Sequence, residues 1–161
     1  MEIHLLNSSH DRKAFDCGND EMNAWLRQMA RQQADKDLIK IYVATTADEP
    51  TKIAGYYAIN TTSVLTEGMG GQKLPSNVPA VLLARLAVDA SYKGQGLGGC
   101  LLMNALELAA ETAELVGIRC IVVDAIDDNA AQFYQHYGFE PLTTDPYRLV
   151  LHLHTVRTLL Q

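Results

Sequence analysis

The chain has 161 residues, a hydrophobic share of 48% and a charged share of 20%, ordinary values for a soluble globular protein. This length suits one domain with a sizeable core, so we expect a single domain over residues 1–161. A net charge of −6 argues against broad, non-specific binding of nucleic acid, and no apolar run is long enough to predict a membrane span.

Cysteine usage and the N-terminus point to a reducing compartment. The three cysteines, Cys17, Cys100 and Cys120, stand at unrelated spacings and form no CxxC pair. We therefore expect neither a disulfide framework nor a zinc or other metal site. The N-terminus, MEIHLLNSSHDRK, lacks a signal-peptide pattern, and the cytoplasm is the simplest location.

The first part of the chain predicts an edge strand followed by an amphipathic helix. Residues 3–6 are a short apolar stretch, and Asn19 is a suitable N-cap for a helix. Apolar residues then recur at helical spacing and predict one buried stripe: Met22, Trp25, Leu26, Met29 and Ala30. Arg27 and Arg31 fall on one exposed side, as a solvated face or as a contact patch for an acidic partner.

Two strands and a long loop are predicted next. Residues 39–44 alternate between apolar and polar positions, and residues 52–64 return as a longer strand, so we expect a hairpin. Residues 66–79 contain glycine and proline without periodicity. A loop of this length is often functional, and this one could border a substrate cleft.

The stretch from Leu82 to Gly99 holds an apolar strand, a polar turn and a glycine cluster, before the aliphatic start of a helix at Leu101. Glycines let the backbone approach a ligand, and successive N–H groups before a helix bind phosphate or pyrophosphate. A dinucleotide fingerprint fits poorly, because residues 89–93 separate the glycines from the strand. We expect a phosphate-bearing cofactor at this turn.

The last part of the chain predicts a helix, a strand, a second helix and a closing strand. The first helix runs from Leu101 to a C-cap at Gly117, and an apolar strand covers residues 120–125. Residues 129–137 fit a short helix, and alternation over residues 149–154 predicts a strand. This order of elements predicts an α+β fold with a sheet of mixed direction.

Two motifs resemble the signatures of the GCN5-related N-acetyltransferases, the GNAT family. Residues 93–98, KGQGLG, resemble the acetyl-CoA loop, although Lys93 stands where arginine or glutamine is usual. The second signature is matched at Ala130, Phe133, Tyr134, Gly138 and Phe139. Asp127 occupies its usual asparagine position. The resemblance implies a mostly antiparallel central sheet flanked by helices, and acyl transfer from acetyl-CoA to an amine.

The resemblance also assigns roles to individual residues. Those assigned to the coenzyme are Leu86, Ala87, Val88, Lys93, Gly94, Gln95, Gly96, Leu97, Gly98, Gly99 and Phe133. Backbone N–H groups near residues 86–88 could polarise the thioester carbonyl if the strand splays there. Tyr134 is the candidate general acid for the leaving thiolate, or a group that positions the sulfur, or a packing aromatic. Tyr137 is expected on the core side with Phe133.

Four segments are similar to the acetyltransferase toxins of bacterial toxin–antitoxin modules: residues 15–18, 23–26, 83–89 and 145–151. That resemblance implies the α-amino group of aminoacyl-tRNA as acceptor, a ribbon–helix–helix antitoxin as partner, and a homodimer as one assembly. An α-amino group has a pKa near ~8, so part of it is neutral at physiological pH and no general base is required. The candidate substrate contacts are Arg85, Arg27 and Arg31.

Two other functions stay open. An N-acetyltransferase for a small amine or a protein N-terminus would share the coenzyme site, and the acidic charge mildly favours it, since tRNA needs a cationic surface. A non-catalytic acyl-CoA-binding module would bind coenzyme A without turnover. A covalent route through Cys100 is not expected, because nothing in the sequence places a histidine beside it.

Overall fold

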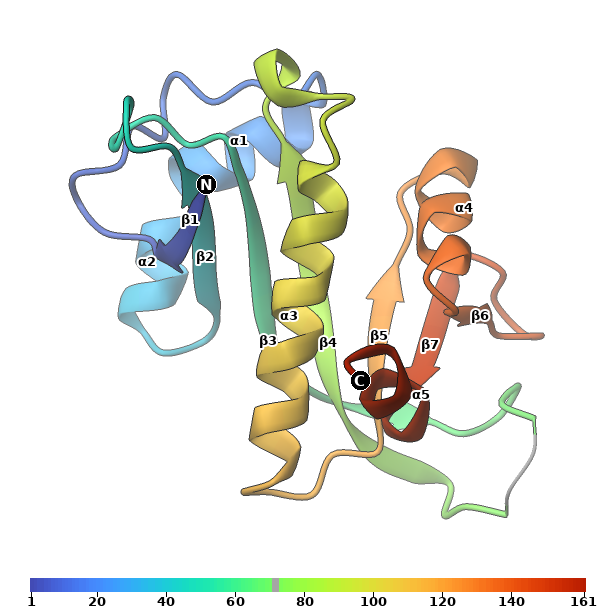
Figure 1. Ribbon diagram of the computed structural model, residues 1–161. Coiled ribbons are helices and arrows are strands. Elements are labelled where there is room, and N and C mark those ends of the chain that lie inside the picture. Colours follow the sequence, from blue (N-terminus) through green and yellow to red (C-terminus); the bar gives the residue numbers. More distant parts are fainter. Residues whose placement is uncertain (71–72) are drawn as a thin grey trace. The chain divides into compact units, whose positions relative to one another are not determined.

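A computed structural model of the chain describes residues 1–70 and 73–161 (Figure 1). The strands are β1 (Glu2–Leu5), β2 (Lys40–Thr45), β3 (Gly55–Leu65), β4 (Asn77–Val88), β5 (Cys120–Asp124), β6 (Glu140–Pro141) and β7 (Arg148–His152). The helices are α1 (Asp20–Gln28), α2 (Ala30–Asp35), the 3₁₀ turn η1 (Ala90–Tyr92), α3 (Leu97–Ala113), α4 (Asp128–His136) and α5 (Leu153–Leu159).

The described strands hydrogen-bond in the order β1-β2-β3-β4-β5-β7-β6. The β4–β5 pair is parallel, whereas β1–β2, β2–β3, β5–β7 and β6–β7 are antiparallel. The prediction of an α+β fold with a mixed, mostly antiparallel sheet is therefore confirmed. None of the helices in the described ranges is long and apolar enough to cross a bilayer.

Internal contacts divide the chain into two compact units. The first unit contains Met1–Asn60 and Ala84–Ala105, and the second contains Thr61–Leu83 and Leu106–Gln161. The single domain over residues 1–161 stays a prediction.

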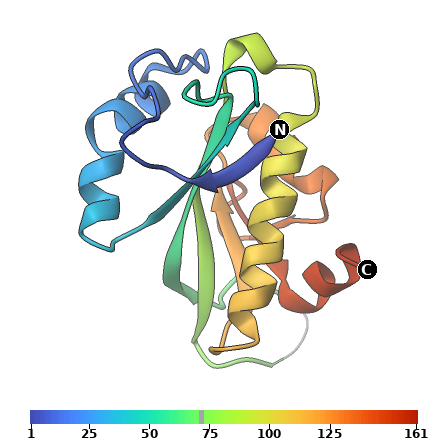
Figure 2. The same ribbon diagram turned by 60° about the vertical axis from the view of Figure 1, so that its left-hand side comes forward.

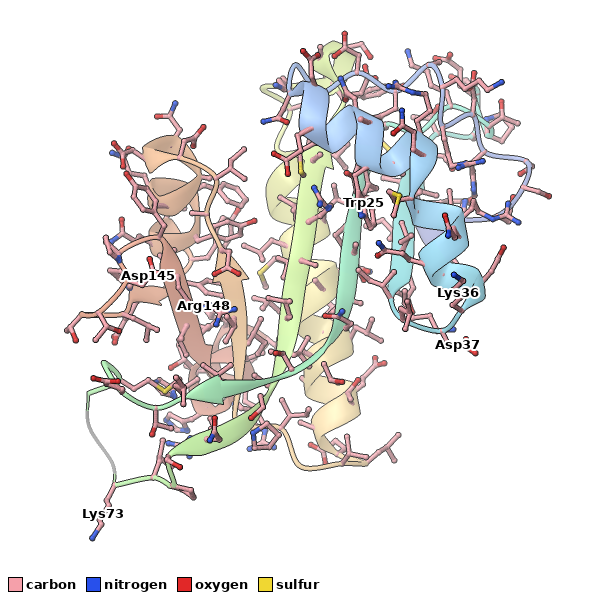
Figure 3. All side chains as sticks on the ribbon, turned by 180° about the vertical axis from the view of Figure 1, so that it is seen from behind. Trp25, Lys36, Asp37, Lys73, Asp145 and Arg148 are labelled. Atoms are coloured by element: carbon pink, nitrogen blue, oxygen red, sulfur yellow. The ribbon has the colours of Figure 1, made fainter. Side chains whose placement is uncertain are left out.

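In the first unit, α1 and α2 lie on one face of the strands, and the first half of α3 lies on the other (Figures 1 and 2). Trp25 projects from α1 toward the strands (Figure 3), where its ring stacks 6.0 Å from that of Tyr56. The core of this face also contains Phe15, Met22, Leu26, Ala30, Ile41, Val43 and Ile53. Burial of these apolar side chains stabilises the unit.

In the second unit, β5 lies between β4 and β7. The first four residues of β5 are buried, so both faces of this strand are covered. A hydrophobic core of the second unit contains Val64, Val78, Ala80, Cys120, Val122, Leu142 and Val150.

Several predicted elements are confirmed. β1 is an edge strand, and Asn19 caps α1 by accepting a hydrogen bond from the Met22 N–H group at 3.0 Å. The hairpin of β2 and β3, the strand β5 and the helix α4 also lie where the sequence predicts them. Each of these signals is local in the sequence.

Two boundaries in the first half differ from the prediction. The predicted strand over residues 52–64 begins only at Gly55, and the predicted loop over residues 66–79 ends before Asn77, where β4 starts. Pro79 lies inside β4 and its carbonyl accepts a hydrogen bond from the Arg119 N–H group at 2.9 Å. Two residues of that loop, Gly71 and Gln72, lie outside the described ranges.

The helix that carries the apolar stripe is broken at Met29. Met29 has φ −113°, which ends α1, and α2 begins at Ala30. The break changes the phase of the stripe, so Met29 is 40% exposed although the other four predicted members are buried. The prediction that Met29 is buried is therefore wrong.

The limits of α3 also differ from the prediction. The helix starts at Leu97 rather than at Leu101, because the Leu97 side chain is buried and anchors the first turn. It ends at Ala113, and Gly117 is not its C-cap. The Thr112 carbonyl accepts from the N–H groups of both Leu115 and Val116, which closes the helix early.

The predicted closing strand over residues 149–154 ends at His152. The next residue, Leu153, begins α5, in which Leu153 and Val156 are buried one turn apart. Helical spacing of these two side chains outweighs the alternation that predicted a strand. The short strand β6 was not predicted either.

Candidate active site

The turn between β4 and α3 carries the glycines that the sequence singles out. Gly94 and Gly96 both have a φ of +79°, and a Cβ built on either would meet no atom within 4 Å. Residues with a Cβ rarely adopt this φ, so glycine is needed for the conformation. The space beside both residues is open, and a ligand can approach the backbone there.

The amide groups of this turn are available to a ligand. Within residues 1–70 and 73–161, six consecutive N–H groups have no hydrogen-bond acceptor: those of Gly94, Gln95, Gly96, Leu97, Gly98 and Gly99. The next N–H group, of Cys100, donates to the Gly96 carbonyl at 3.2 Å. Free amide groups at the start of a helix attract anions, so the residues present fit a pyrophosphate group.

Asp89 fixes the start of this turn. The side chain is almost completely buried, and it accepts hydrogen bonds from the Asp16 N–H group at 3.0 Å and from the Ser91 hydroxyl at 2.7 Å. Burial alone would raise the pKa of Asp89, but the bonds from Asp16 and Ser91 outweigh it and the pKa lies below its ordinary value. The ionised carboxylate ties the N-terminal segment to the turn.

The segment around Asp16 is ordered by further hydrogen bonds. Asp16 accepts from the Gly18 N–H group at 2.9 Å and from the Asn23 side chain at 3.0 Å, and these bonds lower its pKa. Lys93 donates from Nζ to the Cys17 carbonyl at 2.6 Å. Lys93 therefore uses one of its three donors on this segment and keeps two for a ligand.

The end of β4 packs against the first turn of α3. The parallel pairing with β5 covers residues 80–83 and stops before residues 86–88, whose N–H groups were predicted to meet a thioester carbonyl. A Cβ on Gly55 would lie 3.0 Å from the Ala87 carbonyl oxygen and 3.2 Å from a Leu97 methyl carbon. Only glycine allows so close an approach of β3, β4 and α3.

The candidate substrate arginines all belong to the first unit. The Arg85 guanidinium lies 4.7 Å from the centre of the Trp25 ring, a cation–π contact, and 3.4 Å from the Met22 sulfur. Arg27 on α1 is exposed and Arg31 on α2 is half-buried. In the described part of the chain none of these arginines pairs with a carboxylate, so their charge is available to an anionic substrate.

Tyr134 lies in the second unit and is the buried aromatic residue of α4. It is 7% exposed, whereas Phe133 and Tyr137 are half-buried. The Tyr134 ring packs edge-on against Phe139 at 5.5 Å, because the chain turns back after Gly138. The prediction that Tyr137 is the tyrosine on the core side is therefore wrong.

The Tyr134 hydroxyl keeps its hydrogen-bonding capacity. Among the described residues, no group hydrogen-bonds with this hydroxyl, and it does not belong to the fully enclosed unpaired polar atoms. Burial raises the pKa of Tyr134 well above its ordinary value. The phenol is therefore protonated over the physiological range and can donate a hydrogen bond to a substrate.

Comparison with known families decides the assignment. The family described as acetyltransferase (GNAT) domain matches residues 37–141, a range that contains the glycine turn and Tyr134. The chain belongs to the GNAT family. Its members are acetyltransferases, and the amide-lined turn lies where the sequence resemblance to the GNAT acetyl-CoA loop places it.

Similar proteins within the GNAT family include toxins. A curated relative from Mycobacterium tuberculosis, the "tRNA-acetylating toxin", is 33% identical over 158 residues, covering 96% of this chain and 93% of the relative. The structure of AtaT complexed with acetyl-methionyl-tRNAfMet is 25% identical, with a TM-score of 0.92 and 99% of both chains covered. A mutant AtaT toxin bound to the C-terminus of the antitoxin AtaR and acetyl-CoA is 26% identical, with a TM-score of 0.86, covering 99% of this chain and 98% of that chain.

At Asp127 this GNAT chain departs from the usual asparagine, and the structure gives that residue a structural role. Asp127 is the N-cap of α4 and accepts a hydrogen bond from the Ala130 N–H group at 2.8 Å. A carboxylate at this position also interacts favourably with the helix dipole. Aspartate at position 127 therefore still supports the start of α4, the helix that carries Tyr134.

A second set of bonds holds the loop before α4, and the sequence did not reveal it. The Tyr147 hydroxyl donates to Asp128 at 2.6 Å, and Arg148 forms two bonds with Asp124, at 2.8 and 3.2 Å. Arg148 is labelled on β7 in Figure 3. The Ala125 N–H group also donates to the Tyr147 carbonyl at 2.7 Å.

The structure brings together one part of the predicted site and leaves another in the second unit. Residues 85–88 and 93–99 lie in the first unit, joined through Gly55 and Asp89, whereas Phe133 and Tyr134 lie in the second. Sequence reasoning did not assign Asp89 to the site, although Asp89 ends the 83–89 segment that resembles the toxins and its Asp-x-Ser spacing to Ser91 is a further local signal. Over the described residues, no group of three or more His, Cys, Asp or Glu side chains is arranged to hold a metal ion.

Proposed function

We propose that this GNAT chain transfers the acetyl group of acetyl-CoA to the α-amino group of an aminoacyl-tRNA and acts as the toxin of a toxin–antitoxin pair. The observation that carries the proposal is similarity over 96% of the chain, at 33% identity, to a relative whose name is tRNA-acetylating toxin. The AtaT structure with acetyl-methionyl-tRNAfMet, which matches 99% of the chain, supports the same acceptor.

In this proposal the turn after β4 binds the coenzyme. The six free N–H groups of residues 94–99 donate to pyrophosphate oxygens, and the N-terminal end of α3 adds its dipole. Lys93 contributes its two remaining donors. Asp89 keeps the turn in place through its bonds to Asp16 and Ser91, so the N–H groups are aligned before the ligand arrives.

The chemical step then needs few protein groups. The amine nitrogen forms a bond to the thioester carbon, the carbon–sulfur bond breaks, and the ammonium proton leaves to water. Backbone N–H groups of residues 86–88 stabilise the carbonyl oxygen as it gains negative charge. Tyr134 donates its hydroxyl proton, or a hydrogen bond, to the departing sulfur. The candidate coenzyme residue Phe133 contacts the Tyr134 ring at 5.2 Å.

A tRNA acceptor requires cationic surface on a chain of net charge −6. Arg27, Arg31 and Arg85 supply it in the first unit, because no carboxylate of the described residues neutralises them. We expect Arg27→Ala and Arg31→Ala each to weaken tRNA binding and to reduce the salt dependence of that binding by about one counterion. Unchanged binding and salt dependence in both variants would remove these arginines from the substrate site.

The acceptor is tested directly with the purified chain and labelled acetyl-CoA. Charged tRNA, the same tRNA without its amino acid, a free amino acid amide and a peptide with a free N-terminus are offered in parallel. We expect label on charged tRNA alone. Label on the amide or the peptide at equal rate would favour the small-amine or N-terminal enzyme, and coenzyme binding without label on any acceptor would favour a non-catalytic module.

The toxin assignment is tested in cells. Loss of aminoacyl-tRNA to acetylation would stop translation, so we expect cytoplasmic expression of the chain alone to arrest growth. Co-expression of a ribbon–helix–helix antitoxin from the neighbouring gene should restore growth. Normal growth on expression of an enzymatically active chain would be compatible with an acetyltransferase but would exclude the toxin role.

A further inference from the structure

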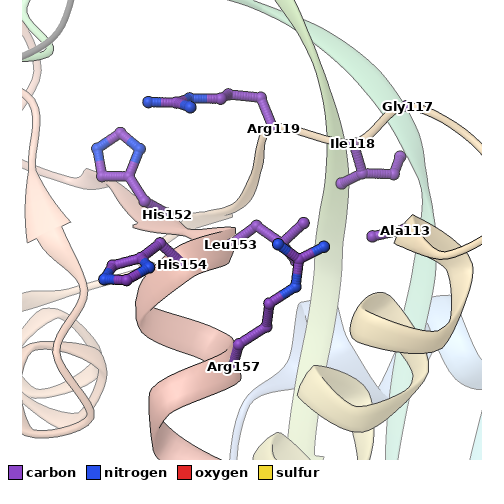
Figure 4. Close-up of a pocket in the computed structure, with 8 residues that line it drawn as sticks. All are labelled: Ala113, Gly117, Ile118, Arg119, His152, Leu153, His154 and Arg157. Atoms are coloured by element: carbon purple, nitrogen blue, oxygen red, sulfur yellow. The ribbon is translucent and has the colours of Figure 1, made fainter.

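The second unit contains a cavity of about 310 Å³ that no part of the proposed reaction uses. It lies between the C-terminal end of α3, the residues before β5, and the start of α5 (Figure 4). Four of its lining side chains are basic: Arg119, His152, His154 and Arg157. No carboxylate lines the cavity. The cavity therefore has a local excess of basic side chains, although the chain as a whole has more acidic than basic residues.

Strand register and helix spacing bring these basic groups together. Cys120 pairs with His152 in the antiparallel β5–β7 ladder, so Arg119 and Leu153 are neighbours, and the Leu153 N–H group donates to the Arg119 carbonyl at 3.2 Å. His154 and Arg157 follow on α5, three residues apart, and therefore lie on adjacent positions of one helix face. The cluster is fixed by regular structure.

A further feature points to an anionic ligand. Arg157 has only a weak ionic partner, since the Arg157–Glu114 distance is 4.0 Å and the Glu114 side chain is 74% exposed. Figure 4 shows Arg157 extending from α5 toward Leu153 and Ile118.

We propose that this cavity is a phosphate-binding site, at the opposite end of β5 from the α4 that carries Tyr134. Guanidinium groups donate to phosphate oxygens in pairs, and imidazole N–H groups add single bonds. The volume suits one phosphate group with a small substituent. The cavity lies at the start of β5, whereas Tyr134 follows the end of β5, so the two are separated by the length of that strand, roughly 3.3 Å per residue.

The phosphate could be free or could belong to the RNA backbone, and the experiment distinguishes these sources. Inorganic phosphate is titrated calorimetrically into the full chain at constant ionic strength, set with chloride. An acceptor-stem RNA hairpin that carries no amino acid is titrated separately, with and without phosphate. Neither titration involves acetyl-CoA, so the result is independent of the proposed function.

We expect Arg157→Ala and His154→Ala each to weaken phosphate or RNA binding about tenfold, and Arg157→Lys to lose less. Both residues are largely exposed, so these variants should fold, and their melting temperatures check this. Lys36→Ala, on an exposed lysine of the other unit, is the matched control for loss of one charge.

Weaker phosphate binding with unchanged RNA binding would identify a free phosphate as the ligand. Weaker RNA binding, with phosphate as competitor, would identify the RNA backbone. Phosphate and RNA affinities that change no more in Arg157→Ala and His154→Ala than in Lys36→Ala would overturn the proposal.

Discussion

At the scale of single residues, the site depends on polar groups with unusual surroundings. Tyr134 is a buried phenol whose hydroxyl has no partner among the described residues, and Asp89 is a buried carboxylate that accepts three hydrogen bonds. The first is suited to donate to a ligand, and the second to hold backbone groups in place. Their substitution should therefore affect different quantities.

Tyr134→Phe should reduce the rate of acetyl transfer by about 100-fold or more, the usual contribution of a general acid. Its free energy of unfolding should change by less than about 0.5 kcal/mol, because no protein hydrogen bond is lost. Single-turnover acetyl transfer and urea denaturation measure the two quantities. Tyr137→Phe, on the next helical turn, is the control, and equal rates in both variants would exclude Tyr134 as the acid.

Asp89→Asn should lower the free energy of unfolding at pH 7 by about 2 kcal/mol, because an amide is a weaker acceptor for the Asp16 and Ser91 donors. The exposed Asp48→Asn variant should be unchanged. Urea denaturation measures both. A loss no larger than that of Asp48→Asn would show that Asp89 does not hold the turn.

The same variant has a defined pH dependence. The pKa of Asp89 is depressed in the folded chain, so its stabilisation is complete above the unfolded value of about 3.8 and is lost as pH falls through the lower folded value. The difference between parent and Asp89→Asn should therefore be constant from pH 7 to pH 5 and shrink below about pH 4. A difference that grew on acidification would contradict this.

At the scale of elements, local signals predicted most of the helices and strands, but not β6, α5 or the break between α1 and α2, and they often misplaced the ends. Asn19 was identified as a cap because its side chain bonds within its own helix. The start of α3 depends on contact of Leu97 with Gly55, and the end of β4 pairing depends on β5. Contacts of that kind join distant segments, and no local pattern encodes them.

The N-cap of α4 gives a prediction at this scale. Asp127→Ala should lower the free energy of unfolding by about 1 kcal/mol, because the Ala130 N–H group loses its acceptor. Asp127→Asn should be nearly neutral, since asparagine is an equally good cap and is the usual residue of the GNAT signature. Urea denaturation of the two variants measures these free energies. Equal losses of unfolding free energy in both variants would show that Asp127 does not stabilise the helix by capping it.

At the scale of the whole molecule, the order of elements predicted the fold class, and the glycine spacing predicted a turn at which Gly94 and Gly96 have positive φ. Binding of the coenzyme at that turn stays a prediction. It did not predict the bond between Asp16 and Asp89, which are 73 positions apart, or the basic cavity beside α5. The predicted strand over residues 149–154 takes in the first two residues of α5, and no helix is predicted after it, so His154 and Arg157 could not be placed on one helix face. The Asp16–Asp89 bond and the basic cavity both depend on tertiary structure.

Binding of coenzyme at the glycine turn is the property on which acetyl transfer depends most. Calorimetric titration of acetyl-CoA into the parent, Gly96→Ala and Gly70→Ala measures it, since Gly96 has a positive φ and Gly70 does not. A Cβ at Gly96 costs about 1–2 kcal/mol in this conformation and displaces the aligned N–H groups. We expect Gly96→Ala to raise the dissociation constant about tenfold or more, with Gly70→Ala unchanged; equal affinity in all three proteins would show that acetyl-CoA does not bind this turn.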